Sequence, residues 1–377
     1  MNKKLMAVAV AAAMAPGLAL AQSSVTISGI FKTGLDNIRI GSRAVGNSSE
    51  WRITDNSSRI IFNVTEDLGG GMQAIAQLDV RFTTDLQANA AGANTISNGG
   101  NTWVGLRGKS WGTVTMGQHD LHYGKQPDDI ASKAGALMAS SVSLMDSTSA
   151  GGVNTAIAGN TRTRNVLRYD TPQWGIFSGT VAWSANPTGS EADITAANTT
   201  RKGNAWTINP VLTGANWQAG YSYWRQKSDV AGGTTGQRGD VLYGFYRWGG
   251  FKLGLAWNKS RVISDLAGGG DVNRRTAWTI PASYTWGKHN VYGHYTRAND
   301  DKVVAGDQAA RMWAFAYVYD LSKRTSAGVT YAKIRNSAGA SYNFFTNAVT
   351  GAFGSVGAAP AAGEDPRLIA FTVRHAF

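Results

Sequence analysis

Runs of about ten residues in which apolar and polar side chains alternate recur along most of the chain. In residues 72–82, apolar side chains from Met72 to Phe82 share one face, and Gln77, Asp79 and Arg81 share the other. The same alternation recurs in residues 251–258, 313–319 and 369–377. Runs of this length and polarity are typical of tilted β-strands that cross a membrane.

Aromatic residues gather near the ends of these runs. Trp217, Tyr221 and Tyr223 form one such group, and Trp278, Tyr284 and Trp286 form another; the chain holds 13 Trp and 13 Tyr in all. In a soluble β-sandwich the apolar faces would point into a core and would not be bordered by Trp and Tyr. The grouping therefore favours a lipid-facing surface with aromatic girdles.

Short and long connections between the runs alternate strictly. Seven are short: 69–71, 109–112, 173–175, 214–216, 249–250, 287–289 and 321–324. Eight are longer and polar: 38–57, 84–101, 119–163, 185–203, 227–239, 261–273, 298–309 and 336–366. Fifteen connections join 16 strands. The alternation predicts an all-β fold, a transmembrane antiparallel β-barrel of about 16 strands with tight turns at one end and long external loops at the other. A barrel of this size leaves an aqueous channel.

The third long connection, residues 119–163, is the least ordinary. Most connections are a few residues long, and a much longer one is usually functional or disordered. Its middle carries apolar residues from Ile130 to Leu144. We therefore expect this loop to fold back into the barrel and to narrow it.

The first 21 residues have the features of an export signal. Lys3 and Lys4 precede an apolar segment that ends in an Ala-Leu-Ala cleavage site, which predicts a signal peptide at 1–21 and a single barrel domain at 22–377. Without those two lysines, 34 basic and 24 acidic residues remain. The basic residues are scattered singly, which favours a positive lumen or surface over a nucleic-acid partner. The chain has no cysteine, so its stability must come from backbone pairing and burial.

Five short motifs stand out: SVTISG at 24–29, TEDLGGGM at 65–72, WVGL at 103–106, GTVTMG at 112–117 and VRHAF at 373–377. Together they resemble motifs of the trimeric general porins of Gram-negative outer membranes, most closely the betaproteobacterial porins. The resemblance covers the whole chain after the signal. It implies a homotrimer in outer-membrane lipid, a third loop folded into the pore, and a terminal Phe377 that the barrel-assembly machinery recognises. The chain departs from the family at Gly117-Gln118-His119, where relatives often carry an Arg after the Gly.

Alternation assigns several charged residues to the lumen, because a charge facing lipid costs a few kcal/mol near the midplane. We expect a basic wall opposite the third loop and acidic residues on the loop itself. The basic candidates are Lys32, Arg59, Arg81, Arg164 and Arg168, and the acidic ones are Asp120, Asp128, Asp129 and Asp146. Two alternatives stay open: the basic residues merely solvate a wide lumen, or the aspartates hold the loop against the wall.

Signals for catalysis or cofactors are weak. The sequence contains no G-x-S-x-G elbow and no complete phosphate-binding loop. His119 and His122 form a pair without a third ligand nearby, so neither a metal nor another cofactor is expected.

We therefore predict an outer-membrane porin for passive diffusion of ions and small hydrophilic solutes, with a preference for anions. One alternative is a channel specific for phosphate or organic anions, which would need a longer series of basic residues along the pore. Another is a surface adhesin or receptor that uses its long loops, especially 336–366.

Overall fold

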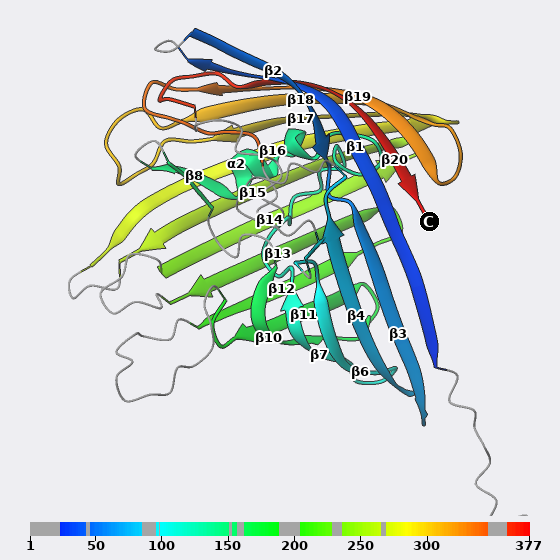
Figure 1. The fold of residues 1–377 in the computed structure, drawn as a ribbon. Coiled ribbons are helices and arrows are strands. Elements are labelled where there is room, and N and C mark those ends of the chain that lie inside the picture. Colours follow the sequence, from blue (N-terminus) through cyan, green and yellow to red (C-terminus); the bar gives the residue numbers. More distant parts are fainter. Residues whose placement is uncertain are drawn as a thin grey trace, which may run out of the picture.

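The structure is a computed structural model that describes residues 23–42, 46–84, 96–97, 99–150, 153–156, 162–187, 204–227, 236–264, 269–345 and 360–377. The predicted signal peptide lies outside the described residues. Within them the chain is almost entirely β-strand, as Figure 1 shows. None of the described helices is long and apolar enough to cross a membrane.

The wall consists of consecutive antiparallel strands. Its first part contains β1 (Ser24–Ser42), β2 (Gly46–Asp55), β3 (Arg59–Gly69), β4 (Met72–Phe82), β5 (Ile96–Ser97), β6 (Thr102–Gly108) and β7 (Gly112–His119). Its second part contains β10 (Thr163–Asp170), β11 (Phe177–Ser184), β12 (Ala205–Thr213), β13 (Trp217–Gln226), β14 (Gly236–Trp248), β15 (Phe251–Ile263), β16 (Asp271–Trp286), β17 (His289–Ala298), β18 (Ala310–Asp320), β19 (Thr325–Asn336) and β20 (Arg367–Ala376).

These elements occupy 16 positions in a closed barrel, counted over the described residues. Strands β2 and β3 share one position, because β2 pairs with the second half of β1 and β3 with the first half. In the same way β5 and β6 both pair with β4. Strand β1 also pairs with β20 from Ile30↔Ala376 to Arg39↔Arg367, which closes the barrel. The predicted all-β barrel of about 16 strands is confirmed.

The alternation places large apolar side chains on the outside. In β15, Leu255 is 56% exposed while its neighbour Ala256 is fully buried. In β18, Phe315 is 57% exposed and lies between buried Ala314 and Ala316. An outer surface of large apolar residues suits contact with lipid.

Two details of the connections follow from backbone pairing. At the turn after β3, Gly69, Gly70 and Gly71 all have positive φ (81°, 60° and 79°), which residues with a Cβ rarely adopt. The first predicted long loop is shorter than its polar composition indicates, because β1 and β2 continue as a hairpin from Thr33↔Asp55 to Ser42↔Gly46. A ladder of backbone hydrogen bonds needs no apolar face, so a polar stretch can extend it.

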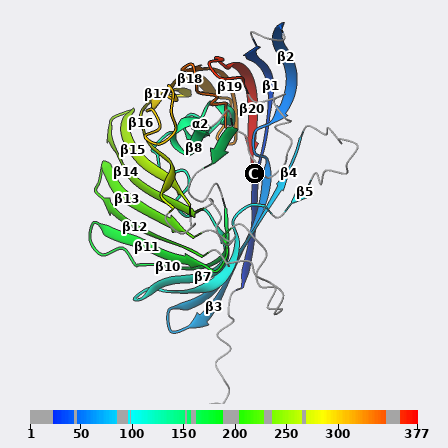
Figure 2. The same cartoon turned by 90° about the vertical axis from the view of Figure 1, so that its left-hand side faces the viewer.

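The loop between β7 and β10 enters the barrel. It contains η1 (Leu137–Ala139), α2 (Val142–Met145), and the small hairpin of β8 (Ser147–Ala150) and β9 (Val153–Ala156). Figure 2 shows α2 and β8 inside the curve formed by β15 to β20. The expectation that this loop folds inward is met. We call residues 120–146 the inner loop.

Candidate functional site: the constriction of the pore

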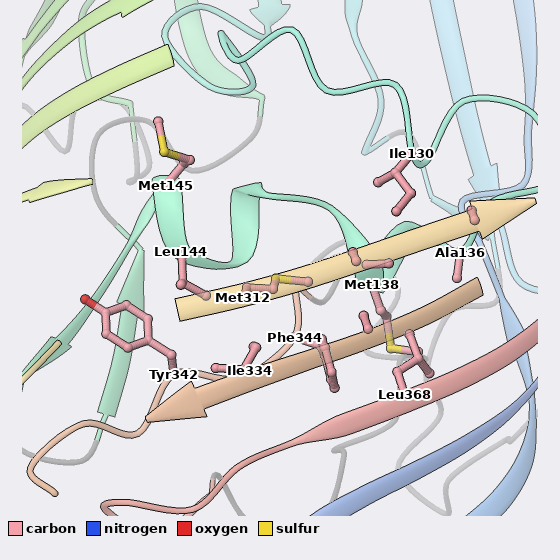
Figure 3. Packing of buried hydrophobic residues seen from close by; sticks show 14 of the residues in the cluster. Ile130, Ala136, Met138, Leu144, Met145, Met312, Ile334, Tyr342, Phe344 and Leu368 are labelled. Carbon is pink, nitrogen blue, oxygen red and sulfur yellow. The ribbon is translucent and has the colours of Figure 1, made fainter. Parts of the chain in front are cut away.

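The inner loop is held to the wall by an apolar cluster. Ile130, Met138 and Leu144 of the loop are at most 1% exposed, and they join Met312 and Ile334 of the wall in one buried cluster. Figure 3 shows these side chains meeting along β18 and β19. Burial of apolar surface contributes about 25 cal/mol per Å² to stability. This packing therefore holds the loop against one side of the barrel wall.

Hydrogen bonds from wall side chains to the loop backbone complete this attachment. His294 Nε2 donates to Ala139 O at 2.7 Å, and Asn258 Nδ2 donates to Met145 O at 2.9 Å. Asn56 Oδ1 accepts a bond from the backbone N–H of Leu137 at 2.9 Å. The loop backbone therefore bonds to strands β15 and β17 and to the segment between β2 and β3.

A cavity of about 540 Å³ lies between the inner loop and the wall. Among the described residues, one carboxylate and six basic side chains line it. The carboxylate belongs to Asp120, and the basic side chains belong to Lys32, Arg59, Arg81, Lys133, Arg162 and Arg374. The cavity is thus a strongly basic passage beside the inner loop.

Two of these six cations are neutralised by partners. Arg81 is 2% exposed and forms a bidentate ion pair with Asp79, in which both hydrogen bonds are 2.7 Å long. Lys133 of the loop forms an ion pair with Asp320 at the end of β18. These two side chains act mainly as structural links.

Three cations of the wall face the cavity without a carboxylate partner among the described residues. No carboxylate of the described residues lies within 4.0 Å of the charged nitrogens of Lys32, Arg59 or Arg374. The Lys32 ammonium donates to a backbone carbonyl, Ala131 O, at 2.8 Å. Burial and the nearby guanidinium of Arg81 lower the pKa of Arg162, which shows how closely the cations are grouped. The passage therefore carries an excess of positive charge.

The predicted site residues divide into two groups. Lys32, Arg59, Arg81 and Asp120 line this cavity, so the structure brings them together.

The other predicted basic residues, Arg164 and Arg168, lie outside the lining of this cavity. A bulge between Thr163 and Val166 breaks the alternation, and Arg164 is exposed there. Arg168 pairs with Asp170 on its own strand, with both bonds at 2.8 Å. An alternation pattern cannot reveal a bulge, because one extra residue reverses the phase after it.

The other predicted acidic residues, Asp128, Asp129 and Asp146, lie outside the lining of this cavity and bond to the inner loop or to the wall. Asp128 accepts the backbone N–H of Ser141 at 2.8 Å, and Asp129 pairs with Lys252 of β15 at 2.7 Å. Asp146 accepts the backbone N–H of Gly124 at 3.2 Å, and burial raises its pKa to about 6. This matches the alternative in which loop aspartates fix the loop.

The histidines of the loop have structural partners. His119 contacts the hydroxyl of Thr115 at 3.1 Å, and His122 contacts that of Ser222 at 2.8 Å. Each is also stacked on a tryptophan, Trp103 and Trp224 respectively. Within the described residues they belong to no group of three potential metal ligands.

Sequence reasoning missed several lining residues. Arg374 shares the inward phase of β20 with Thr372 and Ala370, so alternation alone would have identified it. Arg162 and Lys133 lie in loop segments, where no periodicity assigns a direction. Tyr123 and Phe345 come from two different loops, and only the folded chain brings them to one cavity.

Comparisons with known proteins identify the family of the chain. The family model described as Gram-negative porin matches residues 7–340. The chain belongs to this family. It is an outer-membrane porin, a water-filled channel through which ions and small hydrophilic solutes diffuse passively.

Individual relatives cover nearly the whole porin chain. An outer membrane porin of Bordetella pertussis is 26% identical and aligns with 88% of this chain and 94% of its own. Outer membrane porin protein 32 of Delftia acidovorans is 27% identical over the full length of both chains. Among solved structures, the anion-selective porin from Comamonas acidovorans has a TM-score of 0.73 and 24% identity. That match covers 94% of this chain and 100% of the other. The last comparison supports the fold.

Proposed function

We propose that this porin prefers anions over cations. The observation that carries the proposal is the cavity at the inner loop, where six basic side chains and one carboxylate make up the charged lining among the described residues. Since Arg81 and Lys133 are paired with aspartates, the preference rests mainly on Lys32, Arg59 and Arg374. Rings of basic side chains favour anions, and low-dielectric walls strengthen their field.

The charges of the site favour general diffusion over recognition of one substrate. Lys32, Arg59 and Arg374 lie around one cavity. A general anion-preferring pore accounts for this arrangement better than a channel specific for one substrate. The printed description of the Comamonas acidovorans protein as anion-selective supports the same direction.

The test is a reversal-potential measurement on the purified protein in a planar lipid bilayer under a KCl gradient. An anion-preferring pore gives a potential displaced toward the chloride equilibrium potential. A potential displaced toward that of potassium would overturn the proposal.

Several further features belong to the same proposal. The chain acts as a channel without catalytic activity or cofactor. It is exported with a signal peptide that is cleaved after Ala21. It assembles as a homotrimer in outer-membrane lipid. Phe377 is a recognition residue for the barrel-assembly machinery, and its backbone exchanges two 3.1 Å hydrogen bonds with Gly29 where the barrel closes. Cross-linking in outer-membrane vesicles and N-terminal sequencing of the mature protein test the trimer and the cleavage site.

A further inference from the structure

Two aromatic side chains line the same cavity as the cations. Tyr123 belongs to the inner loop, and Phe345 belongs to the last external loop. Their ring centroids are 5.9 Å apart, with an angle of 33° between the ring planes. A diffusion pore needs charge and width at its constriction, and neither requires paired rings.

The position of Phe345 is fixed by its surroundings. Its backbone N–H donates to Ser143 Oγ of the inner loop at 2.7 Å. The preceding Phe344 is 2% exposed within the buried apolar cluster, beside Met138 in Figure 3. Two residues earlier, Tyr342 exchanges hydrogen bonds of 3.0 and 2.9 Å with the side chain of Asn336 at the end of β19. Residues 342–345 are thus held in place, with Phe345 as part of the cavity lining.

The cavity therefore combines two chemistries in one space. Guanidinium and ammonium groups bind a carboxylate by charge-assisted hydrogen bonds. Aromatic rings attract another ring in offset or edge-to-face geometry, beyond what apolar burial alone supplies. The volume of about 540 Å³ is several times that of a cavity that holds benzene, about 150 Å³, so a ring, a carboxylate and water fit together.

We propose that this cavity is a binding subsite for small aromatic carboxylates in transit through the pore. The carboxylate lies against the wall cations, Arg59 foremost, and the ring lies against Phe345 and Tyr123. The inference rests on the proposed anion preference, because the same cations attract the carboxylate. Binding holds the solute briefly at the constriction and interrupts the ion current.

The experiment compares three anions as blockers of single-channel KCl current through the wild-type porin: benzoate, cyclohexanecarboxylate and acetate. Benzoate and cyclohexanecarboxylate share the charge and nearly the same size, and differ in aromaticity. We expect benzoate to reach half-block at a concentration about threefold to tenfold lower than cyclohexanecarboxylate. Acetate, which has no ring, should block least.

Substitution of the rings tests the assignment. Phe345→Leu and, independently, Tyr123→Leu keep an apolar side chain but remove one ring. Each change is expected to bring the half-blocking concentrations of benzoate and cyclohexanecarboxylate closer together, so that their ratio approaches one. This ratio does not depend on pore width. The matched control is Phe315→Leu, the same change on the outward face of β18, where Phe315 is 57% exposed. It should keep the wild-type ratio.

The outcomes separate this inference from the proposed function. Equal block by benzoate and cyclohexanecarboxylate in a wild-type pore that is anion-selective would overturn the aromatic subsite alone. An unchanged ratio in both ring variants would also overturn it. A cation-selective wild-type reversal potential would overturn the anion preference on which the subsite depends.

Discussion

The inward faces of the barrel wall differ between its two sides. On β15 to β19 the inward residues are mostly small, and Ala256, Ala277, Ala314 and Ala332 are fully buried beneath the inner loop. We call this side the loop-bearing wall. On β1, β3, β4 and β20 the inward residues include Lys32, Arg59, Arg81 and Arg374, which line the cavity. We call this side the cationic wall.

The difference shows how one pattern of alternation supports two functions. Small side chains let the backbone of the inner loop approach one wall closely. At Gly328 of β19, an added Cβ would lie only 2.9 Å from Ala134 O. On the other wall, long cationic side chains need water or a partner, so the passage remains on that side. The selectivity of the pore therefore depends on where the loop is seated as much as on the charges.

The largest effect should come from breaking the buried ion pair of the cationic wall. Asp79→Asn leaves Arg81, which is 2% exposed, without its carboxylate. Removing one partner of a buried pair costs about 3–5 kcal/mol, measured here as the free energy of unfolding in urea and detergent micelles. The matched control is Asp170→Asn, which breaks a pair of the same type with Arg168 that is 27–30% exposed. It should cost at most about 1 kcal/mol. Equal losses would contradict the distinction between the two pairs.

The next effect concerns pH and the inner loop. Burial raises the pKa of Asp146 from 3.8 to about 6, against the opposing influence of the Gly124 N–H and of Arg275. A raised pKa means that the folded state binds the proton more tightly than the unfolded state. The stabilisation is therefore fully present below pH 3.8 and is lost as the pH rises through about 6.

Asp146→Asn should mimic the protonated form. Its free energy of unfolding should exceed that of the wild type by up to about 3 kcal/mol at pH 7.5, and the gap should close near pH 4. Urea titrations of both proteins at several pH values measure this gap. A gap that is independent of pH would contradict the assignment to Asp146.

A smaller effect separates two aspartates of the inner loop that adjoin in sequence. Asp128 is buried and accepts bonds from Ser141 N and Ser140 Oγ at 2.8 and 3.3 Å. Asp128→Asn weakens charge-assisted bonds and should cost about 2 kcal/mol, with more current noise from a looser loop. Asp129→Asn only breaks the partly exposed pair with Lys252 and should cost about 0.5 kcal/mol. Unfolding titrations and open-channel noise compare the two variants, and a reversed order would refute the proposed anchoring.

The last effect concerns the unpaired charges of the cationic wall, and it matters most for transport. The double change Arg59→Gln and Arg374→Gln should lower the ratio of chloride to potassium permeability roughly fivefold, equivalent to about 1 kcal/mol. Reversal potentials in a KCl gradient measure this ratio. Arg164→Gln removes a charge outside the cavity and should leave the ratio near that of the wild type. A similar fall in both would show that total charge, and not the cavity, sets selectivity.

The sequence by itself determined the barrel. Alternation fixes which side chains face lipid, as at Leu255 and Phe315, because the two faces of a strand are set by the backbone alone. Alternation also assigned Lys32, Arg59 and Arg81 to the inside, and it would have assigned Arg374. The length and apolar middle of the third loop indicated that it packs against a partner.

Only the tertiary structure decided how the inside is divided. The partners of Asp128, Asp129 and Asp146 are loop amides and a lysine of β15, and no local pattern identifies such distant contacts. The bulge before Val166 reversed the phase of Arg164, and the meeting of Tyr123 with Phe345 joins residues from two loops. Periodicity specifies whether a side chain points into the barrel or out of it. The site depends on contacts between the inner loop, other loops and the wall, and these contacts exist only after the barrel closes and the loop packs against it.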